Sequence, residues 1–433
     1  MKRFIKTGLL AAIICSAATL NTAAEALILD IETCIEMALE NNPDFLISNI
    51  SLRTAQRDNN TVWNNFLPTA SLSGYHGGSS AIISDTADFS WSTYGKLSMS
   101  LSLNAEVFKT IESIRLAYEN EQISYETAKR ELVSTVEEEF YYLITSKSSL
   151  EITKASLELA QKNYEQTLSN YNHGMASELS VLQAEINAAN LKPTYKQSLS
   201  NHESRLRNFL IVLGMDPEQE IELEGELNTK IVEFDAEQLI PELSNRLDLQ
   251  TIEKNIEILS NSRTLTALSN KSPTLTASGS WQVEALPSYA DILSLSLTLS
   301  IPIDDFIPGS STSVSLAEID DQIQQYELRL GKAMNEARIE IINLIEQLET
   351  AADNMDISAL NITLAEKTYE MSQQSFARGV VERLDVEDAQ QAYLSAKHQY
   401  LSSQYDYLTG LISLRDALGL STLDELYSKG EIE

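Results

Sequence analysis

The chain has 433 residues and a formal net charge of -32, because 63 Asp and Glu side chains outnumber 31 Lys and Arg side chains. A nucleic-acid-binding protein is excluded, since phosphate recognition requires clustered basic side chains and no such cluster follows the first six residues. With 43% hydrophobic and 22% charged residues, the composition is that of an ordered protein. Length alone predicts two or three domains.

The N-terminus has the parts of a secretory signal peptide. Three basic residues within the first six precede an apolar stretch over residues 8–20, and small residues follow up to Ala24. A single transmembrane anchor is the alternative, but the apolar stretch is shorter than the ~20 residues that a spanning helix requires. We therefore predict a signal peptide over residues 1-24. Its removal leaves only Cys34, so no intramolecular disulfide can form.

The chain repeats itself at an offset of 205 residues. The aligned pairs include Pro68 and Pro273, Gly174 and Gly379, Val181 and Val386, Tyr195 and Tyr400, and Leu213 and Leu418. One offset that holds over so long a stretch indicates a tandem duplication. We predict a first structural repeat over 25-215, a connector over 216-237, a second structural repeat over 238-420 and a C-terminal tail over 421-433.

Each repeat is predicted to contain a long helical hairpin. Apolar residues recur every seven positions, from Val136 to Tyr171 in the first copy and from Ile341 to Phe376 in the second. A sustained seven-residue pattern is typical of long helices packed side by side. No Pro or Gly interrupts residues 105–172, so one helix can run for 68 residues, or about 100 Å at 1.5 Å per residue.

Glycine-containing turns are predicted to reverse both hairpins. Residues 173–175 form the turn of the first copy and residues 378–380 that of the second. The chain then returns through residues 179–213 and 384–418, each ending in Leu-Gly. Pro193 is expected to kink the first returning helix.

Four segments alternate between apolar and polar residues, as the strands of outer-membrane β-barrels do. The clearest is 292–301, and the others are 67–75, 97–104 and 273–283. One face of 292–301 is predicted to contact lipid, and it consists of Leu293, Leu295, Leu297, Leu299 and Ile301. The alternative is a soluble β-sandwich with one face in water.

Four strands cannot close a barrel, for which about eight is the smallest number observed. Open strand edges inside lipid would leave backbone groups without hydrogen-bond partners. A membrane location therefore requires the chain to share its barrel with copies of itself.

In this order, the motifs resemble the outer-membrane efflux protein family, whose best-known member is TolC. The resemblance begins at residues 28–44, which read ILDIETCIEMALENNPD, and passes through FLPTASLSG at 66–74. Its most specific parts are YNHGMASELSVLQAE at 171–185 and FARGVVERLDVEDAQ at 376–390. The turns from strand to helix, near residues 104 and 304, lack the Gly-Gly pair with a basic residue that is usual in the family.

The resemblance implies a fold that is mainly α with a β-barrel portion. Long antiparallel helical hairpins would form a trimeric α-barrel, and each protomer would give four membrane strands to a shared twelve-stranded barrel. The implied function is that of a passive exit duct for a tripartite efflux pump or a type I secretion system, located in the outer membrane and extending into the periplasm.

The partners that the resemblance implies are a homotrimer, a periplasmic adaptor (membrane fusion) protein, an inner-membrane transporter and outer-membrane lipid. The alternative is a soluble periplasmic coiled-coil scaffold or adaptor that does not enter the membrane. That alternative retains the helices but leaves the alternating strands unexplained.

Two sites are implied by the resemblance. The adaptor is expected to dock on the hairpin tips, which comprise Gly174, Met175, Ala176, Gly379, Val380 and Val381. Asp385 and Asp388 are similar to the family's aspartates at the periplasmic constriction, where they would attract cations. Their spacing of three places both on one helix face.

Other roles remain open for the same residues. Asp385 could cap the returning helix, Asp388 could be a solvated charge, and the glycines could simply supply the backbone conformation of a turn. The first copy has Ser180 and Gln183 where the second has the two aspartates, so an acidic constriction would come from one repeat only.

No catalytic or cofactor chemistry is predicted. The four histidines are scattered and have no Cys or carboxylate at metal-ligand spacing. The glycines at 174 and 379 are isolated and form no phosphate-binding loop. We expect no metal, no cofactor and no enzymatic activity.

Overall fold

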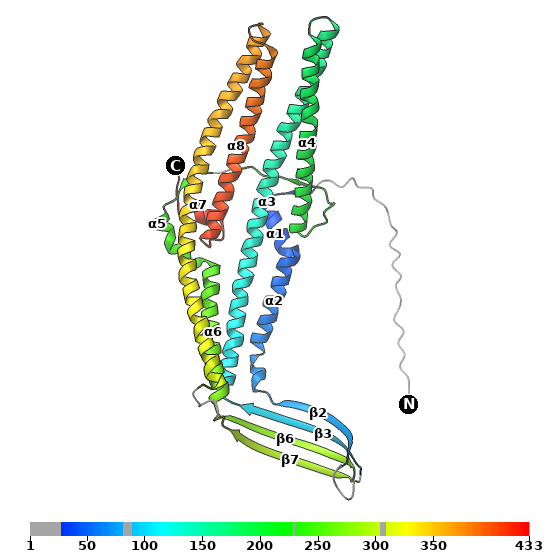
Figure 1. Cartoon of the computed structure of the whole chain (residues 1–433), viewed down its shortest axis with the longest axis vertical. Helices are drawn as coiled ribbons and strands as arrows, with labels where there is room; N and C mark the ends of the chain where they lie inside the picture. Colours follow the sequence, from blue (N-terminus) through cyan, green and yellow to red (C-terminus); the bar gives the residue numbers. More distant parts are fainter. Residues whose placement is uncertain (1–26, 81–88, 228–229, 304–308, 433) are drawn as a thin grey trace, which may run out of the picture.

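The computed structural model describes residues 27–80, 89–227, 230–303 and 309–432. The predicted signal peptide over 1-24 and most of the predicted turn after residue 304 lie outside these ranges. Within them the chain is mostly helical with a few strands, as the sequence predicts. Figure 1 shows an elongated molecule with two helical hairpins at one end and a four-stranded sheet at the other.

The first half of the chain forms a small strand, two short helices, two long strands and a long hairpin. These are β1 (Leu27–Leu29), α1 (Ile31–Asn41), α2 (Pro43–Asn60), the 3-10 helix η1 (Val62–Phe66), β2 (Thr69–Ser79), β3 (Ser90–Leu103), α3 (Glu106–Asn172) and α4 (Glu178–Val212). The connector adds short elements, namely β4 (Ile221–Leu223), β5 (Val232–Glu233), α5 (Ala236–Leu239) and the 3-10 helix η2 (Ile240–Asn245).

The second half repeats the plan of the first. Its elements are α6 (Leu247–Lys271), β6 (Thr274–Leu286), β7 (Ala290–Ser300), α7 (Ser311–Ala377), α8 (Arg383–Ala417), α9 (Leu423–Tyr427) and β8 (Glu431–Ile432). Adding 205 to the bounds of α3 gives those of α7, and the same holds for α4 and α8. The predicted long helix begins at Glu106 rather than at residue 105, because Ala105 is its N-cap. Pro193 lies inside α4, which continues on both sides of it.

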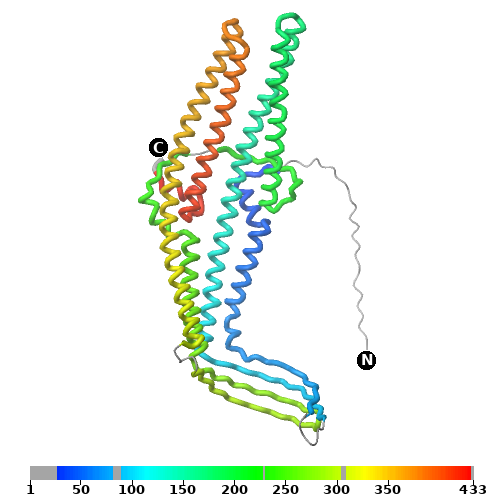
Figure 2. Tube along the Cα trace, in the orientation of Figure 1, coloured from blue at the N-terminus to red at the C-terminus, as the bar shows by residue number. Residues whose placement is uncertain are grey.

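The long helices lie side by side as a wall. In the half that carries the hairpin ends the order is α7, α8, α3 and α4, and toward the sheet α6 and α2 replace α8 and α4 (Figures 1 and 2). At one edge of this wall is α7, and at the other are α4 and α2. Besides the long helices of the wall, α7 contacts the short elements α5 and η2, and α2 contacts α1 and η1.

Two apolar clusters, one from each repeat, hold the hairpins near their mid-length. The first includes Leu29, Val136, Phe140, Leu143, Phe209 and Leu213, and the second includes Ile341, Leu348, Tyr407, Leu411, Leu414 and Leu418. The seven-residue stripe is therefore core in this region. Its last members, Tyr171 and Phe376, are exposed, because near the hairpin ends fewer elements pack around each helix.

The four long strands form one antiparallel sheet in the order β2-β3-β6-β7. All four predicted strands are present, and β2 extends to Ser79 instead of ending near residue 75. The central pair, β3 with β6, joins the two repeats, with Leu97 opposite Trp281 and Ser100 opposite Ser278. Within the described residues, the outer strands β2 and β7 each pair with one strand only.

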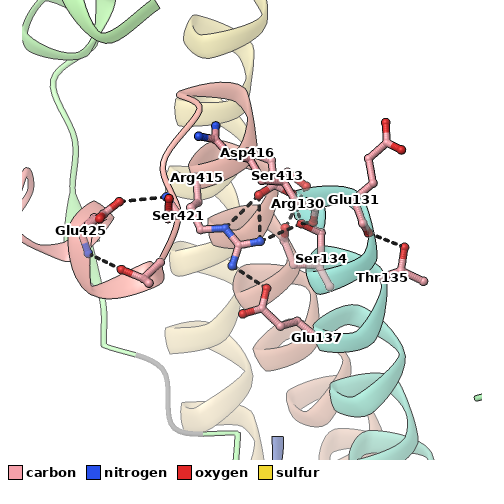
Figure 3. Close-up of polar contacts among 12 residues, drawn as sticks. Arg130, Glu131, Ser134, Thr135, Glu137, Ser413, Arg415, Asp416, Ser421 and Glu425 are labelled. Atoms are coloured by element: carbon pink, nitrogen blue, oxygen red, sulfur yellow. Dashed lines mark hydrogen bonds and ion pairs between the residues drawn. The ribbon is translucent and has the colours of Figure 1, made fainter. Parts of the chain in front are cut away.

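A buried ion pair also joins the repeats, between α8 and α3 (Figure 3). Arg415 is 2% exposed and donates hydrogen bonds to Glu137, to Ser134 Oγ at 2.8 Å and to Asp416 Oδ1 at 2.8 Å. Burial raises the pKa of the Glu137 carboxyl, although the Arg415 charge opposes this shift. At the offset of 205, Arg415 and Glu137 correspond to Leu210 and Ile342, so each partner of the ion pair has an apolar counterpart in the other copy.

Replacing Arg415 by leucine is expected to destabilise the fold by about 3–5 kcal/mol, because the buried Glu137 carboxylate loses its partner. Replacing both residues, Arg415→Leu with Glu137→Ile, is expected to restore most of the lost stability, since no buried charge is then left without a partner. Thermal unfolding of both variants measures the difference. A single variant as stable as the parent would show that the ion pair does not hold the repeats together.

Candidate functional site: the hairpin ends and the four-stranded sheet

Both hairpins end in the same glycine turn. Gly174 and Gly379 each have φ of 72°, the left-handed conformation that glycine adopts without strain. Met175 N–H donates to Asn170 O at 2.8 Å, and Val380 N–H donates to the carbonyl of Ser375 at 2.9 Å. Each glycine N–H also donates to the carbonyl three residues earlier, Tyr171 O or Phe376 O. The two bonds together form the Schellman motif that ends many helices. Chain reversal therefore accounts for both glycines without any partner.

The residues beside the glycines are displayed to solvent. Met175 is 72% exposed and Val380 is 74% exposed, whereas Ala176 and Val381 are half-buried. Leu179 and Leu384, at the starts of the returning helices, are exposed as well. Each hairpin end thus presents two large apolar side chains that the turn itself does not require.

The two returning helices begin with different caps. In the first hairpin, Ser177 is the N-cap and its hydroxyl accepts a hydrogen bond from Ser180 N–H at 3.1 Å. In the second, Glu382 is the N-cap of a capping box, and Asp385 Oδ2 accepts from Glu382 N–H at 2.9 Å. The capping role considered for Asp385 is thus present in the structure, and Asp385 is also exposed.

A cleft of about 850 Å³ separates the first turns of α4 and α8. Its lining comprises Thr167, Ser180, Gln183, Ala184, Asn187, Glu382, Arg383, Leu384, Glu387, Asp388 and Gln391. Asp388 is exposed and faces this cleft, whereas Asp385 is not part of the lining.

Arg383, which the sequence motifs did not single out, connects the two hairpins. Its guanidinium donates to the Thr167 hydroxyl and to Asn163 O at 2.9 Å on α3, and it pairs with Glu387 Oε1 at 3.0 Å on its own helix. A signal was present in the repeat, because the residue 205 positions earlier is Glu178. The charge at this position therefore differs in sign between the two copies.

The four-stranded sheet has one apolar face and one hydroxyl face. On β7, Leu293, Leu295, Leu297 and Leu299 lie on the apolar face and are 62–79% exposed. The opposite face carries serine and threonine hydroxyls that pair across strands, for example Ser278 with Ser296 at 2.7 Å. A contiguous exposed apolar face of this kind marks an interaction surface.

None of the helices within the described ranges is both long enough and apolar enough to cross a membrane. Among the same residues, no group of three or more His, Cys, Asp or Glu side chains is arranged to hold a metal ion. Cys34 is buried and unpaired.

Comparison with known proteins places the chain in a family. The model of the outer membrane efflux protein family matches residues 34–210 and 241–420, and the chain belongs to this family. No significant match was found among curated proteins.

Solved structures share the fold at low sequence identity. The Campylobacter jejuni CmeC outer membrane channel superimposes with a TM-score of 0.77 at 15% identity, covering 92% of this chain and 88% of that one. The outer membrane protein VceC from Vibrio cholerae gives 0.72 at 16% identity, with 90% and 96% covered. The open state of the Neisseria gonorrhoeae MtrE outer membrane channel gives 0.70 at 16% identity, with 90% and 89% covered.

Membership in this family supports an efflux-duct role and an outer-membrane location. A family of channels also accords with the expectation of a protein without catalytic activity.

Proposed function

We propose that three copies of this chain form a passive duct, which crosses the outer membrane and carries cargo outward for a tripartite efflux pump or a type I secretion system. The sheets of the three chains would close a twelve-stranded barrel, and their helices would close an α-barrel through the periplasm. The observation that carries the proposal is that, among the described residues, the outer strands β2 and β7 each have one unpaired side, and the outer helices α4 and α7 each carry exposed apolar residues.

The edges of the sheet support this closure. Within the described residues, β2 and β7 each leave one side of the strand unpaired, next to a face of exposed leucines. Unpaired backbone groups are not tolerated in hydrocarbon, where water cannot satisfy them. Pairing β7 of one chain with β2 of the next satisfies all edges when the ring closes.

The two edges of the helical wall both carry stripes of exposed apolar side chains. Along α7 the exposed apolar residues recur at spacings of three, four and seven, namely Ile357, Leu360, Leu364 and Met371. Along α4 they are Leu179, Leu182 and Ile186. Such stripes are the seams of packed helices. Packing α4 of one chain against α7 of the next would bury both.

The duplication predicts the register of the strand pair between chains. Thr69 and Thr274 are equivalent at the offset of 205. Thr69 is opposite Ser100 on β3, and Thr274 is opposite Ser300 on β7, so Ser300 is the structural equivalent of Ser100. Within the chain, Ser100 is opposite Ser278, and the residue 205 positions before Ser278 is Ser73. Ser300 should therefore lie opposite Ser73 of the neighbouring copy.

A soluble periplasmic scaffold or adaptor is the second candidate. It would leave the leucine face of β7 in water, at a cost of ~25 cal/mol per Å² of apolar surface that lipid would otherwise cover. The mass of the detergent-solubilised protein separates the two candidates. Three chains in an outer-membrane fraction are expected for the duct, and a soluble monomer or dimer would contradict it.

The hairpin ends are proposed to be the docking surface for a periplasmic adaptor, which would join the duct to an inner-membrane transporter. The exposed side chains of Met175 and Val380 and the small residues beside them permit the close approach of another helix pair. Asp385 and Asp388 are proposed to line a constriction near these ends, where six carboxylates from three chains would favour cations.

Charge removal at the constriction can be separated from loss of the helix cap. Asp385→Asn with Asp388→Asn is expected to lower the cation preference of the channel in planar bilayers while leaving the melting temperature unchanged, because asparagine retains an acceptor for Glu382 N–H. Asp385→Ala is expected to lose about 1 kcal/mol of stability in addition, since the capping box is broken. Undiminished cation preference in the double asparagine variant would mean that other residues build the constriction.

A further inference from the structure

The hydroxyl face of the sheet has an unusual composition in the part that adjoins the helices. Over this part of each strand, every residue on the face is serine or threonine. The positions are Thr69, Ser71, Ser73, Ser98, Ser100, Ser102, Thr274, Thr276, Ser278, Ser280, Ser294, Ser296, Thr298 and Ser300. We call these fourteen residues the hydroxyl wall. None of them carries a charge, in a chain whose net charge is -32.

Neighbouring strands pair many of these hydroxyls with one another. Oγ–Oγ distances are 2.8 Å for Thr69 with Ser100, 3.0 Å for Ser71 with Ser98, 3.1 Å for Ser102 with Thr276 and 2.7 Å for Ser278 with Ser296. Because a hydroxyl both donates and accepts, such a surface can solvate cations and anions equally. Hydroxyls that are already hydrogen-bonded to one another also bind a passing solute weakly.

Among the described residues, the charges on this face begin at the edge of the hydroxyl wall. Lys96 on β3 is opposite Ser73 of the wall on one side and Gln282 on the other, and Glu284 on β6 is opposite Tyr94. The two have opposite sign and lie two residues apart along the sheet, so their charges cancel. Tyr94 in turn stacks on Tyr75 with ring centroids 5.0 Å apart. The described part of the hydroxyl face is thus neutral as a whole.

We propose, on the basis of the duct described above, that the hydroxyl wall makes the membrane section indifferent to the charge of its cargo. Anionic, cationic and neutral polar solutes pass the wall equally well. Screening in salt limits the reach of distant charges to about 8 Å, so carboxylates on the helices do not impose a sign on the wall. Any charge preference of the duct arises in its helical section.

Single cysteines on the wall test this inference in the intact trimer. Ser100→Cys and Ser296→Cys place a thiol on two different strands of the wall, both away from Lys96, and Leu297→Cys places one on the opposite face. The native Cys34 does not interfere, since it is buried and its pKa is raised to about 12 by burial. Membrane-impermeant cationic and anionic methanethiosulfonates, added to outer-membrane vesicles, report how readily each charge reaches the thiol.

At both wall cysteines, the ratio of cationic to anionic rates is expected to match that of a free thiol in solution within about twofold, because a neutral wall adds no charge-dependent free energy. Leu297→Cys is expected to react with neither reagent. A ratio that departs from the free-thiol value about tenfold or more, equivalent to ~1.4 kcal/mol, would overturn the charge-indifferent wall and leave the duct intact.

The same variants distinguish failure of the duct itself. Reaction at Leu297→Cys but not at Ser296→Cys would show that the apolar face, and not the hydroxyl face, is in contact with water. Ready reaction at both positions would show that the sheet lies outside lipid. Either result would contradict the proposed function as well as the wall.

Discussion

Replacing Leu297 by arginine is expected to abolish the assembled trimer, whereas replacing the adjacent Ser296 by arginine is expected to leave it assembled. The two side chains point to opposite faces of β7, and Leu297 is 72% exposed on the apolar face. A charge on the lipid face near the bilayer midplane costs about 2–4 kcal/mol per strand, and three chains would carry it at once. Heat-modifiable migration of the outer-membrane fraction measures the assembled form.

Two comparisons make the result interpretable. Leu297→Ile conserves the apolar face and should assemble like the parent, which controls for disturbance of the strand. Ser296→Arg should assemble and alter the single-channel conductance, since its charge faces the duct. If arginine is tolerated equally at the two positions, the proposed orientation of the sheet is wrong.

A double substitution at the hairpin ends, Met175→Glu with Val380→Glu, is expected to abolish export while the trimer stays intact. Both side chains are largely exposed, so carboxylates there cost the fold little, but they would add charge to the apolar surface on which the adaptor is proposed to dock. Export of a fluorescent dye by cells that depend on this channel provides the measurement.

The matched control for the hairpin ends is Met175→Leu with Val380→Ile, which keeps the apolar surface and should export normally. Gly174 and Gly379 are left unchanged in both variants. Substituting them would strain the turn, because both have positive φ, and a loss of export could then not be assigned to docking. Normal export by the double glutamate variant would exclude these ends as the docking surface.

Much of the fold can be predicted from two patterns in the sequence. The offset of 205 residues predicts the second hairpin from the first, and the bounds of α7 and α8 follow from those of α3 and α4. The alternation of residues 292–301 predicts which face of β7 is apolar, because side chains along a strand alternate regardless of the rest of the fold.

The contacts that join the repeats could not be predicted in this way. Arg415 with Glu137 and Arg383 with Thr167 bring together residues more than 200 positions apart, and no local period encodes such a pairing. Comparing the copies provides a partial signal, since Leu210 and Glu178 occupy the positions equivalent to the two arginines. The exposure of Tyr171 was likewise not predictable from the stripe, because burial depends on how many elements surround the helix.

Disulfide crosslinking between the outer strands tests the three-chain duct most directly. Ser73→Cys with Ser300→Cys places thiols on β2 and β7, which lie three strand spacings apart within one sheet, or about 14 Å. That separation is too long for a disulfide inside one chain, and Cys34 is buried. The proposed duct predicts that mild oxidation produces a ladder of covalent species that ends at three chains, while the chains of each single-cysteine variant stay uncrosslinked. Monomers alone, or a ladder that continues beyond three chains, would contradict it.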